Sequence, residues 1–180
     1  MYNTIKKIVA PIAEKNIPLA IVFGNHDAEA QPKLPFLAKE NQICIYAEYE
    51  NFRSTMNDED VSGCANCSLP ILSSDGQHIA WNIWCIDSGD YVRDDEFNVI
   101  DDAGYGFVKK DQLAWYERRA AELKAQNGGK AVPSLLFQHI PVIQEYKKLK
   151  KDPDGEYSLG AQHYSVPDGA LLEGEIHESP

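Results

Sequence analysis

The segment Gly24-Asn25-His26-Asp27 holds the residues of this chain whose types and spacing are best suited to chemistry. It directly follows the apolar run Leu19 to Phe23, which predicts a tight turn at the end of a buried strand. Such a turn would present an amide oxygen, an imidazole and a carboxylate together. These are the groups that metal-assisted hydrolysis of a phosphate ester requires.

A second histidine stands in a similar context further along the chain. The short apolar run Ser134 to Phe137 leads into Gln138-His139-Ile140-Pro141, so a histidine again follows a predicted buried strand. Ligands of open α/β sheets bind outside the carboxyl ends of the strands. If the two strands lie near one another, Asn25, His26 and His139 meet at one rim of the sheet.

Charge and hydropathy limit the partners that the chain is expected to bind. The 180 residues carry a formal net charge of -11, which disfavours nucleic acid and anionic membrane surfaces. No apolar stretch approaches the roughly 20 residues of a membrane span, and Met1 to Ala20 lacks the order of a signal peptide. The compartment stays open, since the natural N-terminus can lie upstream. The apolar content of 43% suits one domain with a core.

The elements that must position these residues can be predicted from periodicity and turn signals. Residues 3–15 form an amphipathic pattern that predicts a helix, kinked at Pro11. The predicted strand Leu19 to Phe23 follows it. A short helix is predicted within residues 31–40, where Pro32 and Pro35 confine it to the part after Pro35. The stretch from there to Gly63 is polar and predicts irregular structure. The apolar face of the first helix consists of Ile5, Ile8, Val9 and Ile12.

The second half of the chain predicts a hairpin, a helix and a strand. Ser68 to Leu72 and Ile79 to Ile86 are strand-like and are separated by a turn containing Asp75-Gly76. Lys109 to Gln126 predicts a helix that covers the sheet. Beyond Val142 the sequence predicts no element. The buried face of the second helix is expected to hold Leu113, Tyr116, Ala120 and Leu123.

The four cysteines, Cys44, Cys64, Cys67 and Cys85, include one C-x-x-C pair. Most C-x-x-C pairs in such a context are reduced thiols or an incidental bridge. Zinc binding and a redox pair stay open as alternatives, although the second pair of ligands that structural zinc usually needs is missing.

Gly24-Asn25-His26-Asp27 followed by His139-Ile140-Pro141 resembles the calcineurin-like metallophosphoesterases, in the branch related to purple acid phosphatases. Asp87-Ser88-Gly89, Gly104-Tyr105-Gly106 and residues 112–115 strengthen the resemblance. It implies an α/β fold, part of an αββα sandwich with mixed sheets flanked by helices. It also implies a centre of two metal ions (Mn, Fe or Zn) that hydrolyses a phosphate mono- or diester substrate.

The resemblance also implies a role for each residue of the two motifs. Asn25, through its amide oxygen, and His139 would bind the same metal ion. His26 would face the substrate, where it would stabilise charge on the phosphoryl group or protonate the leaving oxygen. Asp27 would hold the His26 ring in orientation.

The chain also departs from the family pattern. The first two family motifs, Asp-x-His and a Gly-Asp pair, normally precede the Gly-Asn-His-Asp turn and are missing from residues 1–23. The last motif, Gly-His-x-His, is matched neither by residues 162–164 nor by residues 176–178. We therefore expect residues 1–180 to form a single, incomplete phosphoesterase domain, an internal segment of a longer protein.

Such a segment would have at most partial metal occupancy and little phosphatase activity on its own. Two alternatives remain. The chain can be a non-catalytic binding or regulatory domain that keeps the fold without a complete metal site. It can also be a small zinc module organised by Cys64 and Cys67.

Overall fold

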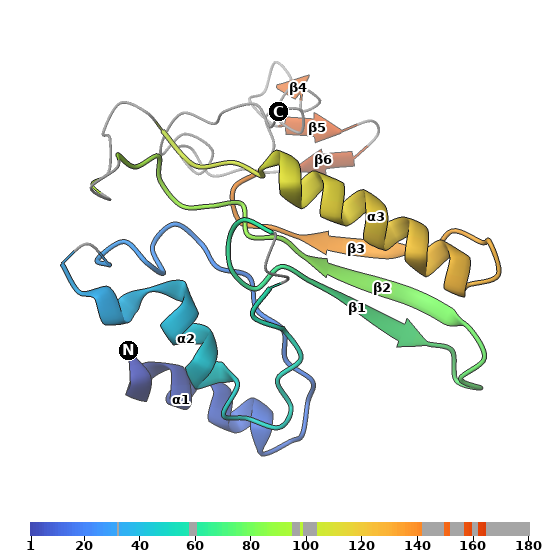
Figure 1. Ribbon diagram of the computed structural model, residues 1–180, viewed down its shortest axis with the longest axis horizontal. Helices are drawn as coiled ribbons and strands as arrows, with labels where there is room; N and C mark the ends of the chain where they lie inside the picture. The colour runs from blue at the N-terminus through green and yellow to red at the C-terminus, as the bar shows by residue number, and fades with distance from the viewer. Residues whose placement is uncertain are drawn as a thin grey trace.

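The computed structural model describes residues 1–31, 33–57, 61–94, 98, 104–141, 150–151, 157–159 and 162–164. These residues form a mixed α/β fold, as predicted, in which a three-stranded mixed sheet packs with helices (Figure 1). This arrangement is compatible with a metallophosphoesterase-like sandwich. None of the described helices combines the length and hydropathy that crossing a membrane requires.

The central sheet contains the predicted hairpin and the predicted third strand. Strands β1 (Cys67–Leu72) and β2 (Ile79–Cys85) are antiparallel, and β3 (Ser134–Phe137) pairs in parallel with β2. The order β1-β2-β3 places β2 in the middle, as its largely apolar sequence predicted. Gly76 adopts a φ of 70° in the turn between β1 and β2, a conformation that glycine adopts without strain.

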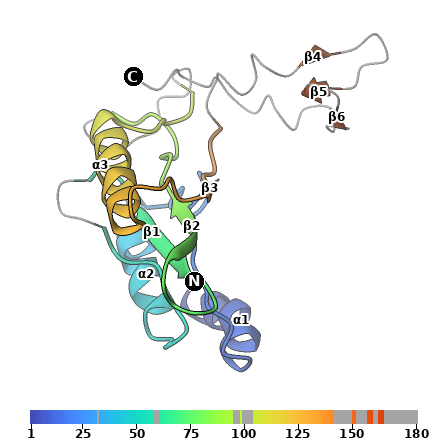
Figure 2. The ribbon, with the colours of Figure 1, turned by 90° about the vertical axis from the view of Figure 1, so that its right-hand side faces the viewer.

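Helix α3 (Lys110–Gln126) connects β2 to β3 and covers one face of the sheet, as Figure 2 shows. Trp84 of β2 meets Trp115 edge-on at 5.6 Å between ring centroids, and Leu123 is buried in the same core cluster. The predicted face of α3 was partly wrong, because Leu113 is exposed and Gln112 is buried in its place. The reason is that the Gln112 amide hydrogen-bonds inside the protein, where apolar periodicity cannot predict it.

The N-terminal part contributes helices α1 (Tyr2–Ala13) and α2 (Lys39–Tyr46) and the short 3₁₀ helix η1 (Pro35–Leu37). The expected face of α1 is only partly buried: Ile5 and Val9 pack into a cluster with Ile45, whereas Ile8 is exposed. Most of α2 was missed by the sequence analysis. Its buried positions mix polar and apolar residues, so it shows no apolar stripe.

The run Leu19 to Phe23 is not a strand of the sheet, so that prediction was wrong. Leu19 forms one isolated parallel bridge to Phe52, and its backbone bonds to the chain on either side of Phe52. The next backbone donor, Ile21 N, bonds to the Ser54 hydroxyl at 3.0 Å instead of to a strand. The apolar character of the run is explained by Phe23, which is buried in a small core cluster with Ile43 and Cys64.

Three short strands lie beyond residue 142, where none was predicted. They are β4 (Lys150–Lys151), β5 (Tyr157–Leu159) and β6 (Gln162–Tyr164), and they form a separate antiparallel sheet. Residues 176–178, which were compared with the last family motif, lie outside the described residues.

Candidate functional site

Asn25 and His139 lie 114 positions apart in sequence, and the structure brings their side chains into contact. The Nε2 atom of His139 is 2.7 Å from the Oδ1 atom of Asn25. Asn25 is 3% exposed, so its side-chain oxygen meets the His139 ring at the edge of the protein interior. An amide oxygen and an imidazole nitrogen at this separation can ligate a common cation with a small adjustment of either side chain.

The backbone around the pair fixes the position of the imidazole. A Cβ atom at Gly24 would lie 3.0 Å from three atoms of the His139 ring, so only glycine lets the ring approach this closely. At the residue after His139, Ile140 N donates to the buried Ser88 hydroxyl at 2.7 Å. Ser88 therefore anchors the turn that carries His139 to the end of β2.

Tyr91 belongs to this site, although the sequence analysis did not identify it. Its hydroxyl accepts a hydrogen bond from Asn25 Nδ2 at 2.7 Å, which directs the amide oxygen of Asn25 towards His139. The Tyr91 ring stacks on Tyr105 at 5.5 Å and meets the His26 ring edge-on at 6.3 Å. The sequence did hold one indication of this role: Tyr91 lies in the polar loop after β2, at the end of the sheet where His139 follows β3.

His26 is the exposed member of the motif, with 67% of its side chain accessible. Its Nδ1 atom lies 2.9 Å from Glu29 Oε2, whereas Asp27 Oδ2 accepts a hydrogen bond from Gly24 N at 2.6 Å. The carboxylate in contact with the His26 ring is thus Glu29, while the Asp27 carboxylate bonds to the backbone of its own turn. The turn explains the difference, because the Asp27 side chain folds back over the three residues that precede it.

A buried ion pair supports the end of β2 beneath this site. Lys39 Nζ lies 2.8 Å from Asp87 Oδ1, and the two side chains are 10% and 2% exposed. The Asp87 carboxylate also accepts hydrogen bonds from the backbone nitrogens of Cys64 and Gly89 at 2.8 and 3.0 Å. The partner of Asp87 on α2 could not be predicted from the sequence, because most of α2 was missed.

The backbone of Asp87 is held as firmly as its side chain. Gln112 Nε2 donates to Asp87 O at 2.7 Å and to Asn66 Oδ1 at 2.9 Å, and Asp87 N donates to the same Asn66 oxygen at 2.9 Å. These buried bonds join α3 and the loop before β1 to the strand end. The segment 87–91, which supplies Ser88 and Tyr91 to the site, therefore starts from a rigid anchor.

All four cysteines are free thiols in the structure. Cys67 pairs in register with Cys85 on the neighbouring strand. A hydrogen bond from Cys85 lowers the pKa of Cys67 against the opposing effect of burial, while burial raises the pKa of Cys64 to about 12. The two thiols of the C-x-x-C pair therefore differ in chemistry. Among the described residues, no three His, Cys, Asp or Glu side chains group as a metal site would require.

Comparisons with known proteins agree with the motifs. The chain is 26% identical over 148 residues to "Probable inactive purple acid phosphatase 14" of Arabidopsis thaliana, a match that covers 74% of this chain and 35% of the relative. It is 28% identical over 182 residues to "Probable inactive purple acid phosphatase 28" of the same plant, covering 94% of this chain and 44% of the relative.

The chain spans less than half the length of either of these curated relatives. No family model matches the sequence, and no solved structure matches it. The similarity of this chain is therefore to purple-acid-phosphatase-like proteins, within a metallophosphoesterase-related family.

Proposed function

We propose that this chain carries one corner of a metallophosphoesterase centre, in which Asn25 Oδ1 and His139 Nε2 are two ligands of one metal ion. The observation that supports the proposal is the 2.7 Å contact between these two atoms. The Asn25 side chain is held by Tyr91, and the Ser88 hydroxyl holds the backbone next to His139, at Ile140 N. The reaction would be hydrolysis of a phosphate mono- or diester.

The donor atoms of this corner fit manganese, iron or zinc, but they do not complete a site. A metal ion in such an enzyme takes four or more ligands, and the described residues supply two at this place. A complete pair of ions would supply the activated water and neutralise charge on the phosphate. The described residues alone do not form that pair, so we propose that the isolated chain has little or no activity.

His26 is the residue proposed to act on the substrate. Its ring is exposed beside the Asn25 corner and is held at Nδ1 by Glu29. An imidazole placed next to a bound phosphate ester can protonate the leaving oxygen or stabilise charge on the phosphoryl group. Asp27 supports this role indirectly, because its bond to Gly24 N shapes the turn that presents His26.

The alternative function is a non-catalytic domain that keeps the fold and binds a ligand or partner without hydrolysis. Two observations favour it. The described residues hold no group of three His, Cys, Asp or Glu ligands, and both relatives carry the word "inactive" in their names. The two functions make different predictions for metal binding, which provides the test.

The test is equilibrium binding of Mn²⁺ to the purified chain, together with turnover of p-nitrophenyl phosphate. We expect about one weakly bound ion per chain, because two ligands cannot hold a metal tightly. The variants Asn25→Ala and His139→Ala should abolish binding. The control His78→Ala removes an exposed imidazole from the hairpin turn and should leave binding unchanged.

Turnover should stay at the level of the uncatalysed reaction in all four proteins. Two tightly bound ions with strong turnover would contradict the incomplete site. Binding that is equal in all variants would contradict the assignment of Asn25 and His139. Complete absence of binding in the unmodified chain would favour the non-catalytic domain.

A further inference from the structure

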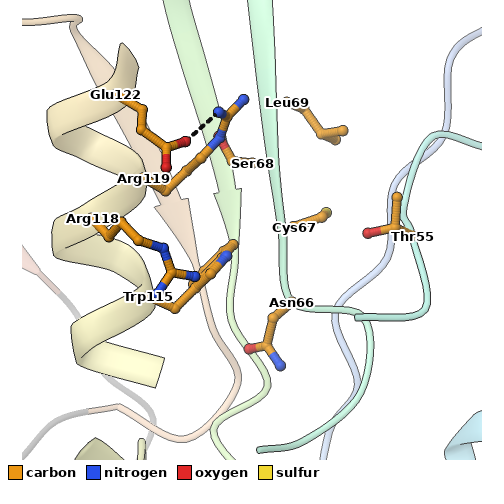
Figure 3. Close-up of a pocket in the computed structure, with 9 residues that line it drawn as sticks. All are labelled: Thr55, Asn66, Cys67, Ser68, Leu69, Trp115, Arg118, Arg119 and Glu122. Atoms are coloured by element: carbon orange, nitrogen blue, oxygen red, sulfur yellow. Dashed lines mark hydrogen bonds and ion pairs between the residues drawn. The ribbon is translucent and has the colours of Figure 1, made fainter. Parts of the chain in front are cut away.

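A pocket lies between helix α3 and strand β1, and none of the residues of the proposed metal corner lines it. Its volume is about 340 Å³, which is within the range of small-molecule sites. Figure 3 shows that side chains from α3 form one wall and that β1 forms the opposite wall. Its lining includes Trp115, Arg118, Arg119, Glu122, Ser68 and Leu69.

The charge of this pocket is opposite to that of the whole chain. Arg118 and Arg119 both extend from α3 towards β1, and the lining contains one acidic residue, Glu122. Glu122 forms an ion pair with Arg119, in which Glu122 Oε2 and Arg119 Nη1 are 2.8 Å apart. The described residues contain no acidic partner for Arg118, so its guanidinium faces the hollow with its charge uncompensated. The pocket is thus locally positive, although the whole chain has a formal net charge of -11.

The remaining walls suit an organic group attached to an anion. Trp115, of which only 5% is exposed, lies beside the Arg118 guanidinium in Figure 3. Leu69 adds apolar surface on the opposite wall. Guanidinium groups bind carboxylate and phosphate oxygens in a forked geometry, and the adjacent indole can contact a flat apolar body.

We propose that this pocket binds a small organic oxyanion, a phosphate or a carboxylate, with its charged group on Arg118 and Arg119 and its apolar part against Trp115 and Leu69. The inference is independent of the proposed phosphoesterase function, because the lining shares no residue with the proposed metal corner. Arg119 would divide its hydrogen bonds between the ligand and Glu122.

The probes are phenyl phosphate, benzoate, inorganic phosphate and phenol, titrated into the metal-free His139→Ala chain so that the other site does not contribute. The indole N–H of Trp115 serves as the NMR reporter. We expect a saturable shift with phenyl phosphate and benzoate, a weaker response to inorganic phosphate and none to phenol. The tighter of the two organic anions identifies the preferred oxyanion. A response to phenol equal to that of the anions, or no saturable shift with any anion, would overturn the proposal.

Three variants test the named contacts. Arg118→Gln should weaken binding about tenfold or more, since it removes a charge-assisted hydrogen bond. Glu122→Gln should strengthen binding several-fold, because it releases Arg119 and removes the negative charge from the lining. The control Lys124→Gln removes one positive charge from the same helix at a residue that lines a different hollow, and should change affinity less than about twofold.

The Lys124 control separates a specific site from general attraction to a basic helix face. Equal losses in Arg118→Gln and Lys124→Gln would overturn the proposal, as would unchanged affinity in Arg118→Gln. Weaker binding in Glu122→Gln would also contradict it. Thermal unfolding of each variant shows whether a loss of binding comes from a loss of structure.

Discussion

Replacing Lys39 with methionine should destabilise the protein by about 3 kcal/mol, because it leaves the buried Asp87 carboxylate without its cation. Breaking a buried ion pair by removing one partner typically costs about 3 to 5 kcal/mol. The lower value applies here, since the Asp87 carboxylate keeps two backbone donors, Cys64 N and Gly89 N. Methionine fills most of the volume of the lysine stem, so the loss reports on charge rather than on a cavity.

The assay is urea unfolding followed by circular dichroism and tryptophan fluorescence, which should give coincident transitions if unfolding is two-state. Lys6→Met is the matched control, because Lys6 pairs with Glu48 at 3.1 Å but both side chains are well exposed. We expect little measurable change there. A double-mutant cycle with Asp87→Asn should show strong coupling to Lys39. Equal effects of Lys39→Met and Lys6→Met would show that burial does not make the Lys39–Asp87 pair more important than an exposed pair.

Three further predictions concern the site and the thiols. Gly24→Ala should displace the His139 ring, since the new Cβ would lie 3.0 Å from it, and should cost about 1 to 3 kcal/mol; unchanged His139 NMR signals would contradict this. Tyr91→Phe should speed hydrogen exchange of the Asn25 side-chain amide, and equal exchange rates would show that the hydroxyl does not hold that amide. The lowered pKa of Cys67 predicts thiolate absorbance that appears at a lower pH than for an ordinary thiol and is absent in Cys67→Ser; no difference between the two titrations would exclude it.

The parts of the fold that the sequence predicted are those determined by local chemistry. The hairpin β1–β2 has an Asp75-Gly76 turn between two β-rich runs, and α3 has a glycine stop at residues 128–129. Helix α2 was missed because its buried face includes Lys39 and Gln42, whose partners lie elsewhere in the chain. Local periodicity carries no information about such partners.

The run Leu19 to Phe23 shows a second limit of sequence patterns. Five apolar residues predict burial, but they do not predict which backbone will supply the hydrogen bonds. In the structure these bonds come from the segment around Phe52 and from the Ser54 hydroxyl. The turn after this run still lies beside His139, because Leu19 and Phe23 anchor it through contacts other than a strand ladder.

Within the candidate site, the sequence pointed to Asn25 and His139 through their motifs, and the structure places them in contact. The residues that orient them, Tyr91 and Ser88, follow β2 and touch the motif residues only after folding. Contacts between residues this far apart depend on the packing of several elements, which a single sequence read locally does not specify.

The most direct test of the proposed metal corner is paramagnetic broadening by Mn²⁺ in the NMR spectrum of the chain. A bound paramagnetic ion broadens the signals of its nearest side chains first. We expect the side-chain signals of Asn25 and His139 to disappear at the lowest Mn²⁺ concentrations, followed by those of Tyr91, and we expect His139→Ala to remove the effect. Broadening that begins at other residues, or that persists in His139→Ala, would contradict the assignment of this site.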